Sequence, residues 1–163
     1  MSVGVTFDDA IAALERHLAN DTKQFERGTI ATDADVTTFQ DRHGVMLSAH
    51  YRTFITTVGA SRLFIDERGN GIDFIGLDQL QAYSERIFYN FGDDLFPDLL
   101  LIASLPGIGA WGGLIPSTDD PDFALLWPDT DPATWNSRVE ETYIRFSKWI
   151  VEITKSSGEK VVP

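Results

Sequence analysis

The chain has 163 residues, of which 43% are hydrophobic and 12% aromatic, and it carries a formal net charge of −12 at pH 7 with no cysteine. This length suits one domain with a packed core, and the missing cysteine excludes a disulfide framework, a thiolate zinc site and a cysteine nucleophile. The acidic balance opposes binding to nucleic acid, and the apolar runs fall well short of the ~20 residues of a membrane helix. We therefore expect neither nucleic acid nor a membrane as a partner.

The N-terminal segment predicts a helix and not a targeting signal. No basic stretch precedes an apolar core in the first residues, so we expect no signal peptide and a cytoplasmic location. Thr6 with Asp9 three positions later is a form of the capping box that starts helices. The apolar residues that follow at helical spacing are Phe7, Ile11, Leu14 and Leu18. The polar stretch Asn20–Ala31 is expected to be a loop anchored by Phe25 and Ile30.

Two further helices are expected before the middle of the chain. The first spans about Asp33–His43, with Thr32 or the aspartate after it as the N-cap. The second spans about Ser48–Val58. Each is followed by a glycine that can adopt the left-handed conformation in which helices often end, Gly44 and Gly59.

The hydrophobic period then changes to short β-rich runs. Leu63–Ile65 and Ile72–Ile75 are joined by a segment that ends in Asn70-Gly71, a pair typical of hairpins. A helix is expected over Leu77–Phe88, where apolar residues return to three- and four-residue spacing. Three more strands, separated by proline and glycine, are predicted at Leu99–Ala103, Leu114-Ile115 and Phe123–Trp127.

The clearest helical pattern lies near the C-terminus. Its apolar stripe comprises Val139, Tyr143, Phe146, Trp149, Ile150 and Ile153. The order of elements, with helices first, strands in the middle and one helix last, predicts a single α+β domain. We expect N-terminal helices, a central and mostly antiparallel sheet, and a C-terminal helix packed on the sheet. We expect this domain to span residues 1–155 and the polar residues 156–163 to form a frayed tail.

The motifs that could carry catalysis fail in their context. Gly107–Gly112 matches G-x-G-x-x-G, but Pro116 leaves no room for the helix that would receive a pyrophosphate, so a turn between strands is expected. His17, His43 and His50 lack metalloprotease spacing, and no G-x-S-x-G elbow marks a nucleophile. The aspartates lack calcium-loop spacing. We therefore predict no enzyme activity, no catalytic residues, no metal and no cofactor.

The negative charge is concentrated between Arg86 and Arg138, a stretch without Lys or Arg. Its acidic residues are Asp93, Asp94, Asp98, Asp119, Asp120, Asp122, Asp129 and Asp131. Such a segment can steer a basic protein partner, although an acidic surface can also serve solubility alone. Trp111 and Trp135 are candidate aromatic anchors beside these acids, with capping of the sheet edge as the alternative. These ten residues form the predicted partner-binding set.

The order of these features resembles the SUKH superfamily, which includes the yeast cell-wall assembly regulator and many bacterial immunity proteins. Its helix, glycine and strand motifs are matched at Val36–Ser48, Tyr51–Gly59, Leu101–Ala103 with Gly107–Gly109, Phe123–Trp127 and Thr142–Ile150. Two positions depart from the pattern: Ser48 replaces the usual proline, and Ala60-Ser61 replaces the usual second glycine or asparagine.

The resemblance implies a non-catalytic protein-binding domain. For a bacterial member it implies an immunity protein that neutralises a toxin of a polymorphic or contact-dependent toxin system. Many such toxins are basic nucleases, which would suit the acidic stretch. The alternatives are a regulatory adaptor or scaffold without a toxin partner, and a hydrolase, for which no nucleophile–base pair can be named.

Overall fold

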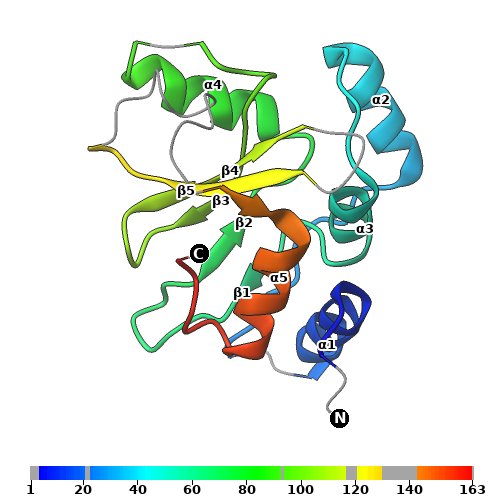
Figure 1. Ribbon diagram of the computed structural model, residues 1–163, viewed down its shortest axis with the longest axis vertical. Helices are drawn as coiled ribbons and strands as arrows, with labels where there is room; N and C mark the ends of the chain where they lie inside the picture. Colours follow the sequence, from blue (N-terminus) through cyan, green and yellow to red (C-terminus); the bar gives the residue numbers. More distant parts are fainter. Residues whose placement is uncertain (1–3, 21–22, 93, 117–120, 130–142, 163) are drawn as a thin grey trace.

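A computed structural model describes residues 4–20, 23–92, 94–116, 121–129 and 143–162 (Figure 1). Within these ranges the helices are α1 (Phe7–Asn20), α2 (Asp33–His43), α3 (Ala49–Thr57), α4 (Leu80–Asn90) and α5 (Phe146–Lys155). The strands are β1 (Arg62–Leu63), β2 (Ile72–Phe74), β3 (Leu100–Leu105), β4 (Ala110–Ile115), β5 (Asp122–Leu126) and β6 (Ile144–Arg145). The α+β fold class and the order of elements predicted from the sequence are confirmed.

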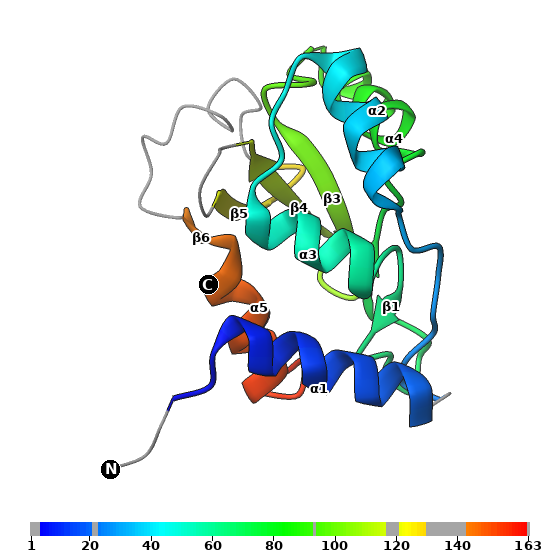
Figure 2. The same ribbon diagram turned by 90° about the vertical axis from the view of Figure 1, so that its right-hand side faces the viewer.

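The six strands form one antiparallel sheet in the order β1-β2-β3-β4-β5-β6, so each strand pairs with its neighbours along the chain. Helix α4 covers one face of the sheet, and α1, α3 and α5 lie on the other (Figure 1). The view turned by 90° shows α1, α3 and α5 on the same side of the strands (Figure 2). The sheet is therefore the middle layer of the fold.

Burial on both faces explains the continuous apolar run in β3. Leu99 and Leu101 belong to a smaller core beneath α4, while Leu100 and Ile102 belong to the main core on the opposite face. All four side chains are 0% exposed. Because alternate residues of a strand point to opposite faces, a strand covered on both sides needs apolar residues throughout.

Helix α5 packs on the sheet as predicted, but it starts later than its sequence pattern indicates. Trp149 is 0% exposed and stacks on Phe123 of β5, with ring centroids 4.0 Å apart. The prediction that Tyr143 belongs to this helix is wrong, because the residues that follow it, Ile144 and Arg145, form β6 and pair with β5. Val139 lies outside the described residues.

The segment after α5 lies against this helix. The indole N–H of Trp149 donates a hydrogen bond to the backbone oxygen of Val161 at 2.8 Å. Lys160 pairs with Glu152 of α5 at 3.0 Å, and Val161 packs against the main core. The domain boundary at residue 155 remains a prediction.

Local signals in the sequence account for the helix ends. In α2 the Thr32 hydroxyl accepts from the Asp35 N–H while the Asp35 carboxylate accepts from the Thr32 N–H, and Thr6 and Asp9 exchange the same pair of bonds at α1. The Ser48 hydroxyl accepts from Tyr51 N–H and caps α3. Ser48 therefore supports the start of this helix by capping.

Two details of the predicted loops need correction. The β1–β2 hairpin forms, but the left-handed residues of its connection are Phe64, with φ 54°, and Gly69, with φ 82°, and not the Asn70-Gly71 pair. The Asp66 carboxylate instead accepts the backbone N–H groups of Arg68 and Asn70 and so shapes the turn. Phe25 is a buried anchor at 4% exposure, whereas Ile30 is 37% exposed.

Replacing Gly59 with alanine should destabilise the fold more than the same change at Gly44. Both residues have positive φ, 70° and 64°, so each alanine bears the left-handed conformational cost of roughly 1–2 kcal/mol. A Cβ at Gly59 would also lie 2.5 Å from the Thr29 carbonyl oxygen, whereas one at Gly44 meets nothing within 4 Å. In urea unfolding, Gly59→Ala should lower the free energy of unfolding at least about twice as much as Gly44→Ala does. Equal decreases would contradict the close approach of Gly59 to the backbone at Thr29.

Candidate functional site

Nine of the ten predicted partner-binding residues, all except Trp111, divide into three groups in the structure. Asp94, Asp98 and Asp129 are exposed. Asp122 is only half-exposed and pairs with Arg145 on the neighbouring strand at 3.4 Å, so part of its charge is already balanced within the fold. The remaining five lie outside the described residues: Asp93, Asp119, Asp120, Asp131 and Trp135.

Trp111 lies on β4, on the sheet face that α4 covers. Its ring meets that of Phe91 edge to face, with centroids 5.8 Å apart, and packs against the smaller core. The side chain is half-buried, so it combines a structural contact with a surface that remains open to solvent. Its use as a partner anchor stays a prediction.

Asp94 and Asp98 lie on the connection between α4 and β3, and this connection packs against α2. Between them, Phe96 contacts the ring of His43 edge to face at 5.0 Å and the ring of Phe39 at 6.3 Å. Figures 1 and 2 both place α2 and α4 at the same end of the molecule. Acidic residues far apart in the sequence, including the exposed Asp41 of α2, therefore lie at one end of the fold, which we call the α2–α4 end.

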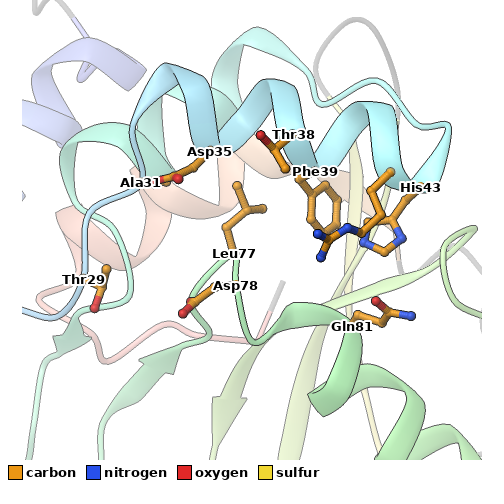
Figure 3. Close-up of a pocket in the computed structure, with 10 residues that line it drawn as sticks. Thr29, Ala31, Asp35, Thr38, Phe39, His43, Leu77, Asp78 and Gln81 are labelled. Atoms are coloured by element: carbon orange, nitrogen blue, oxygen red, sulfur yellow. The ribbon is translucent and has the colours of Figure 1, made fainter.

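A pocket of about 260 Å³ opens at this end, between α2 and the start of α4 (Figure 3). Its apolar lining comes from Ala31, Phe39 and Leu77, its neutral polar lining from Thr29, Thr38 and Gln81, and its ionisable lining from Asp35, Asp78, Arg42 and His43. Sequence reasoning missed this site. Its walls come from three segments without a shared motif, and only Phe39 and Val36 on one helical stripe indicated which side of α2 would face inward.

His43 is held at the edge of this pocket by aromatic contacts. Its ring lies 4.5 Å from that of Phe39 and 5.0 Å from that of Phe96. Partial burial lowers the pKa of the imidazole, the charge of Arg42 lowers it further, and Glu85 opposes both. The neutral ring is therefore favoured, and as the pH falls below the ordinary histidine value of about 6.5 the unfolded chain takes up the proton first, which reduces stability.

NMR titration of His43 should give a pKa below that of the same residue in the urea-unfolded chain. Arg42→Gln should raise the pKa of His43 toward its ordinary value, because a nearby positive charge is removed. Glu85→Gln should lower it further, since a favourable negative charge is lost. A pKa for His43 that neither substitution moves would contradict this account of the pocket's electrostatics.

Other kinds of site find little support in the described part of the chain. The glycine-rich segment forms the predicted turn between strands: Gly109 has φ 67°, and β4 begins at the next residue, where a dinucleotide fold would begin a helix. No three His, Asp or Glu side chains of the described ranges gather to hold a metal ion. Nor is any helix described here both long and apolar enough to cross a bilayer.

Comparison with known proteins places the chain in a class. It belongs to a family of immunity proteins, because it is 32% identical over 139 residues to a protein named as an immunity protein. The match covers 84% of this chain and 82% of the relative. That relative is immunity protein RhsIB of Dickeya dadantii (strain 3937). No protein-family model matches the sequence.

Proposed function

We propose that this chain is an immunity protein that binds a toxin and blocks its action, without catalysing a reaction itself. The observation that carries the proposal is the relationship to immunity protein RhsIB, which extends over more than four fifths of both chains. A relationship of that extent covers most of the chain and not one shared motif. The resemblance to the SUKH superfamily points to the same role.

The charge of the α2–α4 end supports a basic partner. Asp41, Asp94 and Asp98 are exposed there, and the net charge of the whole chain is −12. Opposite charges on two proteins raise the rate of encounter and exclude partners of like charge. We infer that the toxin presents a basic surface to this end of the immunity protein.

A nuclease is the kind of toxin that best suits such a surface. Nucleases hold the phosphate backbone through Lys and Arg, and carboxylates compete for the same cationic groups. An acidic protein bound over them would deny nucleic acid access without any chemical step. We propose that the toxin belongs to a polymorphic or contact-dependent system, and that neutralisation takes place in the cytoplasm.

Co-expression with the toxin encoded beside this gene tests the proposal. Cells that produce the toxin together with this chain should grow, while cells that produce the toxin with an unrelated acidic protein of similar size should not. Protection should be accompanied by a complex that survives purification. A neighbouring toxin that kills equally well in both strains would contradict the proposal and favour an adaptor without a toxin partner.

A further inference from the structure

The pocket at the α2–α4 end has the size and lining for one long side chain. Its volume of about 260 Å³ lies below the roughly 300–1,000 Å³ of pockets that enclose drug-sized ligands and cofactors. Its apolar part is preformed, because Ala31, Phe39 and Leu77 are only 8%, 6% and 6% exposed. Such a surface can cover the hydrocarbon stem of an amphipathic side chain while the tip reaches polar groups.

One end of this pocket is acidic. Figure 3 draws Asp35 and Asp78 toward the same end as Thr29, and His43 toward the opposite end. The Asp35 carboxylate accepts the backbone N–H of Thr32 at 2.9 Å, which fixes it at the start of α2. Asp78 lies just before α4 and is exposed. Two carboxylates from separate segments thus line one small space.

One positively charged side chain, that of Arg42, also lines the pocket, and it is attached in the last turn of α2 whereas Asp35 is in the first. Arg42 follows Asp35 by seven residues in α2, which places their backbones about 10 Å apart along the helix axis. Salt with a Debye length of ~8 Å weakens, without removing, the repulsion that Arg42 exerts on a cation at the acidic end. His43 adds little charge, because its lowered pKa favours the neutral ring.

We propose that this pocket receives an arginine side chain of the toxin, with its guanidinium between Asp35 and Asp78 and its stem against Phe39 and Leu77. The inference rests on the proposed function and deepens it by naming the group that the immunity protein recognises. Arginine fits better than lysine, because its planar fork of N–H donors can reach two carboxylates at once. Arginine is also enriched among the residues that dominate protein interfaces.

Titration of the purified chain with n-butylguanidinium, followed by amide NMR, tests the pocket without a toxin. This probe carries the charged tip of arginine and most of its stem. We expect millimolar binding, with shifts concentrated at Thr38, Phe39, Leu77 and Asp78. The neutral probe n-butylurea has nearly the same shape and should produce little or no shift at these residues, because it lacks the charge.

Two variants complete the test. Asp78→Asn should weaken n-butylguanidinium binding by about tenfold, the effect of losing one hydrogen bond between charged groups. Glu15→Gln removes the same charge from an exposed position of α1 outside the pocket and should leave binding unchanged. Both should retain the native melting temperature within a few degrees, since each replaces an exposed side chain.

Three outcomes would overturn the inference: no shifts at the pocket, equal shifts with n-butylurea, or equal affinity in native chain and Asp78→Asn. Toxin neutralisation does not enter the titration, so the two proposals fail separately. A chain that neutralises its toxin but ignores n-butylguanidinium would overturn the pocket assignment alone. A chain that binds the probe but gives no protection would overturn the proposed function.

Discussion

Replacing Trp149 with alanine is expected to lower the free energy of unfolding by about 3–5 kcal/mol, the usual cost of deleting a buried aromatic side chain. Trp149 is 0% exposed and joins α5 to the sheet by stacking on Phe123 at 4.0 Å and contacting Phe74 at 5.9 Å. Its indole N–H also ties the segment after α5 to the helix through Val161. Alanine would leave a cavity at the centre of the main core and free that carbonyl.

Trp149→Phe separates the contribution of aromatic packing from that of the hydrogen bond to Val161. Phenylalanine keeps an aromatic ring against Phe123 but removes the hydrogen bond to Val161, so the hydrogen-bond part of the loss should be only about 1 kcal/mol, with a further contribution from the smaller ring. Urea denaturation followed by circular dichroism measures both variants. A loss below about 1 kcal/mol for Trp149→Ala would contradict the placement of this side chain in the core.

Reversing two charges at the α2–α4 end should slow association with the toxin by about 10- to 100-fold at low salt. The variant carries Asp94→Lys and Asp98→Lys, two exposed changes that alter the net charge by four units from −12 to −8. Because steering acts on encounter, the association rate should fall more than the dissociation rate rises, and its dependence on salt should flatten.

Asp8→Lys with Glu15→Lys is the matched control. These two exposed acids lie on α1, at the opposite end of the molecule from α4 (Figure 1), and their reversal changes the net charge by the same amount. Stopped-flow measurements at two salt concentrations should show a much smaller effect for this pair. Equal slowing by both variants would mean that total charge, and not the α2–α4 end, directs the encounter.

Much of the fold could be predicted because its signals are local. The capping pairs at Thr6 and Thr32 and the left-handed glycines, Gly44 and Gly59, each act within a few residues, so the sequence alone locates the ends of three helices. Strand β6 could not be found in this way. Its two residues lie between Tyr143 and Phe146 of the predicted helical stripe, and only pairing with β5 makes them a strand.

The candidate site was predictable in charge but not in geometry. The absence of Lys and Arg from residues 87–137 is visible in the sequence, but Arg145 approaches Asp122 only through the pairing of β5 with β6. The pocket depends on a longer connection, in which Phe96 packs on His43 and holds the α4–β3 segment beside α2. Contacts between residues more than fifty positions apart leave no periodic trace in a single sequence.

The most direct test of the immunity role is a titration of the purified toxin with this chain while the toxin's own activity is measured. We expect activity to fall linearly and to reach its minimum at a fixed stoichiometric ratio, as tight binding of a blocking partner requires. The double Asp94→Lys, Asp98→Lys variant should need a longer incubation to reach the same end point. Full toxin activity in a large excess of the native chain would contradict the proposal that this protein neutralises a toxin by binding it.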